Sequence, residues 1–195
     1  MSFTYDTEVA LSSAAALINT GKDDADPLAT LEGLDRFLAE QRFTGSRTHT
    51  DAELASVRTL RAELEVIWFA EEDDAVALVN AILRRAKALP QLVRHDEWDW
   101  HLHATEPDAP LEQRMATEAA MALADVIRGH ELDRLRSCAA EDCDGVVLDL
   151  SRNRSKRFCD TGNCANRTHV KAYRARKTLK GTARERVHEK GESAE

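Results

Sequence analysis

The chain has 195 residues and a mass of 21.8 kDa, with 43% hydrophobic, 32% charged and 5% aromatic residues. This balance excludes a collagen-like or wholly disordered chain, and the length suffices for one or two domains. The longest uncharged run, residues 9–21, has 13 residues, fewer than the roughly 18–20 that cross a bilayer. Acidic residues stand near the amino terminus, where a signal peptide carries Lys or Arg. We therefore expect a cytoplasmic, reducing location and no membrane partner.

The net charge of −8 conceals two parts of opposite charge. Residues 1–150 hold 14 Lys and Arg against 30 Asp and Glu, whereas residues 151–190 hold 13 against 3. Phosphate responds to the local patch, because charge is screened beyond roughly 8–10 Å in physiological salt. The basic segment is therefore a candidate surface for nucleic acid, although the overall pI is about 5.4.

Helical periodicity dominates the first 130 residues. Small apolar residues from 7 to 20 predict a short helix, or a strand followed by a helix. Asp51 is a candidate N-cap for the long helix around Leu54–Ile67. Apolar spacing of three and four residues predicts helices over 28–42, around Leu54–Ile67, around Val76–Leu83 and over 111–128.

A two-residue period replaces the helical one between residues 97 and 104, which predicts a half-buried strand paired with Gln91–Arg94. We expect the tryptophans and Leu102 to face inward, and His101 and His103 to form an outward polar face with Asp99. A metal site on these three polar residues is the alternative, and the outward face explains the alternation more simply.

Catalytic signatures are missing from the sequence. It has no Gly-x-Ser-x-Gly, no His-Glu-x-x-His, no phosphate-binding loop and no dinucleotide fingerprint. We therefore expect that the protein is not an enzyme.

All four cysteines fall within 27 residues, as two pairs with four residues between the members of each pair. Tetrahedral zinc takes four thiolates from two short loops, so the pattern predicts one structural Zn²⁺ and a hairpin between the loops. Disulfides are disfavoured in a reducing compartment, and His169 is a less favoured substitute ligand. A closed site of this kind stabilises the fold and activates no water. The predicted ligands are Cys138, Cys143, Cys159 and Cys164.

The residues around these cysteines, 137–143, 148–159 and 164–167, resemble the CGNR zinc finger, which is named for Cys-Gly-Asn-Arg. In that family the finger follows an ABATE domain, whose members are described as stress-induced transcription regulators, and Leu17–Thr20 is similar to the Asn-Thr signature near its start. The resemblance therefore implies a regulator of transcription. Ala165 stands in the place of the glycine, Phe158 where Trp is usual and Ala16 where Asp is common.

We predict a mainly α protein with a small β element (α+β). An α-rich, ABATE-like domain is expected over residues 1–130, with its linker near Gly129–Asp133. A small zinc-bound hairpin-plus-helix domain, the CGNR-type finger, follows over 131–186, and a polar tail over 187–195.

Double-stranded DNA is the predicted partner of the finger. Four of its basic residues are expected on the hairpin strand that returns to Cys159, and the others on the helix that begins at Cys164. The predicted contact residues are Arg152, Arg154, Lys156, Arg157, Asn166, Arg167, Lys171 and Arg174.

Two other functions stay open, a zinc-containing protein–protein interaction module, whose cations could also pair with the acidic domain, and an RNA-binding protein. The N-terminal domain is expected to sense a small molecule or a protein effector. A homodimer is a further option, because regulators commonly bind paired half-sites.

Overall fold

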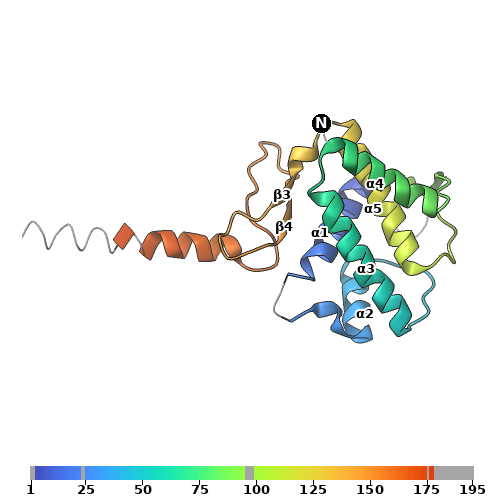
Figure 1. Ribbon diagram of the computed structural model, residues 1–195, viewed down its shortest axis with the longest axis horizontal. Coiled ribbons are helices and arrows are strands. Elements are labelled where there is room, and N and C mark those ends of the chain that lie inside the picture. Colours follow the sequence, from blue (N-terminus) through green and yellow to red (C-terminus); the bar gives the residue numbers. More distant parts are fainter. Residues whose placement is uncertain (1–2, 23–24, 95–98, 175, 178–195) are drawn as a thin grey trace, which may run out of the picture.

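The computed structural model describes residues 3–22, 25–94, 99–174 and 176–177, which form a helical body with two small hairpins (Figure 1). The body contains α1 (Tyr5–Asn19), α2 (Leu31–Glu40), α3 (Asp51–Trp68), α4 (Glu72–Arg85) and α5 (Leu111–Arg128), with short 3₁₀ turns η1 (Pro27–Ala29) and η2 (Leu132–Arg134). The strands are β1 (Gln91–Val93), β2 (His101–His103), β3 (Leu135–Ser137) and β4 (Val146–Leu148). A further helix over 164–174 points away from the body. The predicted fold class, mainly α with a small β element, is confirmed.

The helices bury the apolar faces that their periodicity predicts. α5 packs against α1, α3 and α4, and Ile18, Leu64 and Leu123 are at most 2% exposed. Each such side chain contributes roughly 1.5–3 kcal/mol through burial. Trp68 lies in this core. The sequence therefore placed the main core correctly.

Threonine caps set two helix starts that the sequence analysis placed differently. The Thr30 hydroxyl accepts a hydrogen bond from the Gly33 amide, so α2 begins after Thr30 and the helix expected over 28–42 is divided. Thr50 in turn accepts from the Glu53 amide, so Thr50 and not Asp51 caps α3. In both cases the hydroxyl satisfies an amide that has no partner within the helix.

The first hairpin is confirmed, but its two faces are the reverse of those predicted. β1 and β2 pair antiparallel with Leu92 opposite Leu102. Trp100 and Leu102 are 62% and 42% exposed, whereas His101 is buried. Alternation defines two faces but does not say which one meets the body, and here hydrogen bonds satisfy the imidazole inside. Trp98 lies outside the described residues.

The second hairpin encloses the first cysteine pair and does not connect the two pairs, which corrects the prediction. β3 precedes Cys138, and β4 follows Cys143 and pairs antiparallel with β3. Residues 149–158 form a loop, so the basic residues expected on a returning strand lie on this loop.

β4 separates two apolar clusters. Val146 and Leu148 belong to the helical core, whereas Val147 packs with the cysteines and Ala140. Alternate strand residues point to opposite faces, so one three-residue strand contributes to both clusters. The finger is thus continuous in packing with the helical body, and the predicted domain boundaries stay predictions.

Asn19, the last residue of α1, binds the outer edge of β4. Its Nδ2 donates to the Val146 carbonyl at 3.0 Å, and its Oδ1 accepts from the Val146 amide at 2.7 Å. The side chain is buried and occupies the place that another strand's backbone would take. It therefore joins the first helix to the strand beside the cysteines.

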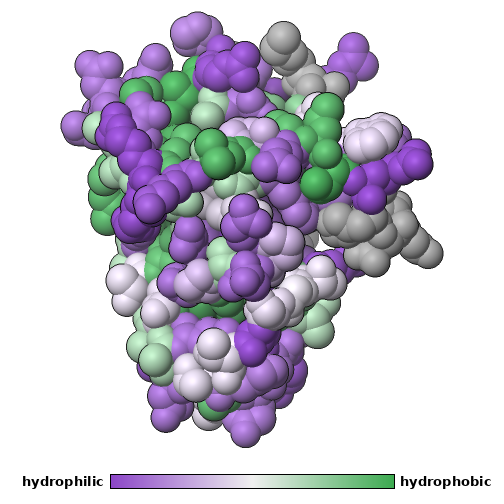
Figure 2. Space-filling view, turned by 90° about the vertical axis from the view of Figure 1, so that its right-hand side faces the viewer, coloured by the Kyte–Doolittle hydropathy of each residue, from purple (hydrophilic) through white to green (hydrophobic). Residues whose placement is uncertain are grey.

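Hydrophilic side chains cover most of the face shown in Figure 2, and hydrophobic ones form separate groups among them. None of the described helices has both the length and the apolar character needed to cross a membrane.

Replacing Asn19 with Ala leaves two backbone groups of Val146 buried without their partner. We expect a loss of about 2–4 kcal/mol in the free energy of unfolding, because each group costs about 1–3 kcal/mol. Denaturant unfolding of the zinc-loaded protein measures it. The control Asn80→Ala changes a half-buried amide on α4 and is expected to stay within about 0.5 kcal/mol. Equal stability of the two variants would contradict this role of Asn19.

Candidate metal centre and nucleic-acid interface

Four cysteine sulfurs converge at the side of β4 that faces away from the helical core. The Sγ atoms of Cys138, Cys143, Cys159 and Cys164 all lie within 4.8 Å of one another, and the Cys143–Cys159 and Cys159–Cys164 distances are 3.6 and 3.5 Å. Four thiolates at 2.3 Å from a zinc ion would be about 3.8 Å apart in a tetrahedron. The donor set and its spacing therefore fit one Zn²⁺ in a closed, structural site.

The loops around the sulfurs supply hydrogen-bond donors. The Gly145 amide donates to Cys143 Sγ at 3.4 Å, the Cys159 amide to Cys138 Sγ at 3.5 Å and the Thr161 hydroxyl to Cys159 Sγ at 3.4 Å. Cys164 begins the helix of residues 164–174, so the positive end of that helix lies at the cluster. These donors stabilise thiolate, which is the form that binds metal.

Three of the cysteine thiols differ in their pKa. Burial raises the pKa of Cys143 and of Cys164. Burial opposes ionisation of Cys159 too, but hydrogen bonds from Thr161 and Gly162 lower its pKa to about 6. Four thiolates so close together therefore need a cation to hold them.

Gly145, directly before β4, lies where Asn19 and two of the sulfurs approach the backbone closely. A Cβ atom here would lie 3.1 Å from Asn19 Oδ1 and 3.2 Å from the sulfurs of Cys143 and Cys159. A side chain here would force these neighbours to shift by a few tenths of an ångström, so the glycine helps the Asn19 contact and the sulfur cluster to lie next to each other.

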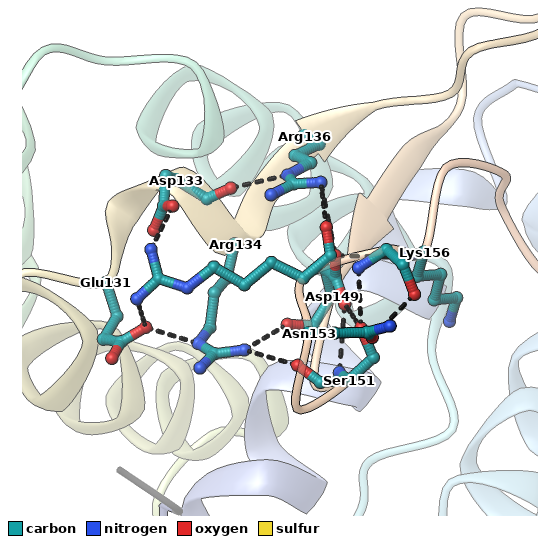
Figure 3. Close-up of polar contacts among 10 residues, drawn as sticks. Glu131, Asp133, Arg134, Arg136, Asp149, Ser151, Asn153 and Lys156 are labelled. Atoms are coloured by element: carbon teal, nitrogen blue, oxygen red, sulfur yellow. Dashed lines mark hydrogen bonds and ion pairs between the residues drawn. The ribbon is translucent and has the colours of Figure 1, made fainter.

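The loop of residues 149–158 is built around the buried carboxylate of Asp149 (Figure 3). This carboxylate accepts hydrogen bonds from the Ser151 amide at 3.0 Å and the Lys156 amide at 3.1 Å, and Arg136 lies 3.2 Å away. Burial alone would raise the pKa of Asp149, but the hydrogen bonds from Ser151, the Arg136 guanidinium and the Lys156 amide hold it below its ordinary value. The Asp149 carboxylate therefore contributes fully to folding stability at neutral pH, and this contribution declines only in acid.

Arginines fasten the loop to the segment after α5, where the sequence analysis expected a linker. The buried Arg134 pairs with Glu131 at 2.5 Å and donates to the Asp149 carbonyl at 2.8 Å. Arg154 pairs with Glu131 at 2.7 Å and also with Asp133. Through these pairs Arg154 holds the loop against the segment after α5. Its backbone is left-handed, with a φ of 52°.

The other predicted DNA-contact residues lie on the exposed surface of this loop and of the helix after Cys164. Three of them form surface ion pairs, Lys156 with Asp160 at 2.7 Å, Arg167 with Asp142 at 3.3 Å and Lys171 with Glu141 at 2.5 Å. Exposed pairs of this kind contribute only about 0–1 kcal/mol to stability. Arg167 also donates to the Gly162 carbonyl at 2.9 Å and to Cys164 Sγ at 3.4 Å. Arg157 lies 6.0 Å from the Phe158 ring centroid. The remaining members, Arg152, Asn166 and Arg174, are exposed.

Residue spacing did not identify the polar residues that shape this surface, namely Asp149, Ser151, Arg134 and Glu131. The Asp-x-Ser order of residues 149–151 is typical of a side chain that bonds the backbone two residues later, and this signal could have found the loop. The contacts of Arg134 and Glu131 depend on tertiary packing alone.

The purified protein is expected to hold one zinc per chain in native mass spectrometry, and Cys164→Ser weakens zinc binding by more than about 100-fold. Losing only a hydrogen-bond partner of a metal ligand already costs about 10–100-fold. His169→Ala is the control, because His169 contacts the Phe158 ring at 6.2 Å and is outside the sulfur cluster. A metal-free, folded finger, or loss of zinc in His169→Ala, would contradict the four-cysteine site.

Asp149→Asn removes the charge at the centre of the loop and is expected to cost about 2–4 kcal/mol at pH 7. The loop amides of Ser151 and Lys156 then exchange hydrogen faster in the zinc-loaded protein, which mass spectrometry of the exchanged peptides measures. Asp108→Asn, an exposed aspartate in another loop, is the control. Unchanged exchange across 149–158 would contradict the organising role of Asp149.

Comparison with known families agrees with the order of these two parts. Residues 134–177 match the family described as "CGNR zinc finger", and residues 11–130 match ABATE, described as "Putative stress-induced transcription regulator". No curated protein matches the chain significantly. Neither family is an enzyme family. The ABATE match covers more than half of the sequence and the finger follows it, so the chain belongs to the ABATE family and carries a CGNR zinc finger with four cysteines that can bind one zinc ion.

Proposed function

We propose that the protein is a DNA-binding regulator of transcription whose zinc finger contacts the phosphates of duplex DNA and whose N-terminal domain responds to an effector. The observation that carries the proposal is the pair of cationic surfaces attached to one metal centre. The loop of residues 149–158 ends at Cys159 and the helix of residues 164–174 begins at Cys164, so the cysteine cluster holds both surfaces in place.

The helix supplies cations along one side. Arg167, Lys171 and Arg174 follow one another at four and three residues, which places them on one face. The helix points away from the body, which leaves it accessible to a duplex. Asn166, which is also exposed, has the amide that pairs with adenine in base recognition.

The loop supplies the second set of cations. Arg152 and Arg157 are exposed, and arginine forms paired hydrogen bonds to phosphate or guanine. The Lys156 ammonium pairs with the exposed Asp160. Arg154 acts indirectly in this proposal, because its guanidinium lies between Glu131 and Asp133.

A homodimer and a cytoplasmic location stay predictions.

Acidic residues of the first cysteine loop compete with phosphate for the helix cations. Asp142 and Glu141 lie between the first two cysteines and pair with Arg167 and Lys171. Binding of a duplex would exchange these carboxylates for phosphates, which releases bound counterions from the DNA. The acids thus lower the affinity for nonspecific DNA.

Duplex binding is expected to weaken steeply as the salt concentration rises. Arg167→Ala and Lys171→Ala should each make the negative slope of log affinity against log salt shallower by about 0.9, because one phosphate contact is lost. Glu141→Gln acts in the opposite direction and strengthens binding, because Lys171 loses a competing carboxylate. Fluorescence anisotropy with a labelled duplex at several salt concentrations measures these slopes on the zinc-loaded protein.

Arg84→Ala, a change of the same charge on α4, is the matched control and leaves the slope unchanged. A slope that ignores Arg167 and Lys171 would favour the interaction module over the DNA reader. Tighter binding to a structured RNA than to a duplex of equal length would favour the RNA-binding alternative.

A further inference from the structure

A cavity of about 890 Å³ lies among the first half of α1, the later part of α5, the residues after α2 and the β1–β2 hairpin. Pockets for small molecules commonly measure about 300–1,000 Å³. The cavity is remote in sequence from the cysteines, and nothing in the proposed DNA contact uses it.

Aromatic side chains form part of the wall. Tyr5, Phe43 and Trp100 line the cavity from three different segments. Trp100 is 62% exposed, and the Arg94 guanidinium lies 5.1 Å from its ring centroid. The indole thus already attracts a cation, as expected of an electron-rich ring face.

Carboxylates give the cavity a negative charge. The acidic side chains that line it outnumber the two arginines, Arg42 and Arg114. Arg114 is buried, and its guanidinium donates to the backbone carbonyls of Thr44 and Ser46, both at 2.6 Å, and to that of Ala109 at 3.1 Å. Its charge is therefore directed at the surrounding loops. The acidic lining residues are Asp6, Asp99, Glu106, Glu118 and Asp125.

The inward histidines belong to the same wall and pair with each other. His101 Nδ1 lies 2.7 Å from the Asp99 carbonyl, which can only accept a hydrogen bond, and His101 Nε2 lies 3.1 Å from His103 Nε2. Only one proton fits between the two Nε2 atoms, so the pair adds at most one positive charge to the wall. The outward polar face expected from the sequence is thus part of the cavity wall.

Glu118 lines both this cavity and a small adjoining one. The small one is also lined by Ala10 and Ser13 of α1 and by Phe43, so Glu118 lies where α5 faces α1. Its side chain is half-buried. An ammonium group beside it would be partly desolvated, which strengthens its attraction to a carboxylate.

We infer that the cavity binds a small organic cation, an amine with an aromatic or apolar body that packs against Phe43 and Trp100 while its ammonium group meets Glu118. This inference names the chemical class of the effector in the proposed function. Binding itself does not depend on that proposal, and only its biological role rests on it. α1 carries lining residues from Tyr5 to Ser13 and ends at Asn19, which binds β4 beside the cysteines. Occupancy of the cavity thus acts on the helix that holds the finger.

The test uses the full zinc-loaded chain and matched pairs of probes that differ mainly in charge: phenethylamine with 3-phenylpropionate, and tryptamine with indole-3-propionate. We expect an amine to raise the melting temperature and to bind in calorimetry, while its carboxylate partner does neither. Glu118→Gln then weakens binding of that amine by about tenfold or more, since a hydrogen bond to a charged group is lost. Trp100→Ala weakens it as well without touching the buried core.

Two controls isolate the cavity. Glu112→Gln removes the same charge from the first turn of α5 outside the cavity, and Phe69→Ala removes an exposed aromatic ring elsewhere. Both are expected to bind the amine like the unchanged protein. Binding of no amine, equal binding of a carboxylate, or binding that Glu118→Gln and Trp100→Ala leave intact would overturn the inference. None of these outcomes depends on DNA, so failure of the ligand and failure of the DNA proposal are separate results.

Discussion

The structure depends on the strand β4, which is shared by two apolar clusters. Val146 and Leu148 complete the core of the helical body, and Val147 between them covers the cysteine cluster. β3 satisfies one edge of β4 and the Asn19 side chain satisfies the other. Three consecutive residues therefore hold the metal centre at a set position against the helices, because a shift by one residue would exchange the two faces.

The basic surface is shaped by two kinds of support. Four thiolates around one ion set the ends of the loop and the start of the helix. Buried polar groups shape what lies between, since Asp149 gathers the loop amides and Arg134 and Arg154 join the loop to Glu131. Arg134 and Arg154 thus support the fold through ion pairs with Glu131, whereas Arg152 and Arg157 of the same loop lie exposed.

α1 connects the cavity with the cysteine cluster. Its first half lines the cavity, its apolar face packs against α5 and α3, and its last residue binds β4. At Gly145, Asn19 Oδ1 and two cysteine sulfurs lie 3.1–3.2 Å from the place that a Cβ atom would take. α1 thus contacts the cavity at one end and the strand beside the cysteines at the other.

The sequence by itself determined most of the helices, the four-cysteine zinc site and the family, because periodicity and ligand spacing are local properties of the chain. Only the tertiary structure decided which face of the β1–β2 hairpin turns inward, since alternation is symmetric and the buried His101–His103 pair depends on hydrogen bonds formed on folding. It also decided that the second hairpin encloses the first cysteine pair and that Arg154 belongs to the loop's support. These outcomes depend on partners distant in sequence, such as Asn19 for β4 and Glu131 for Arg154, which no local pattern specifies.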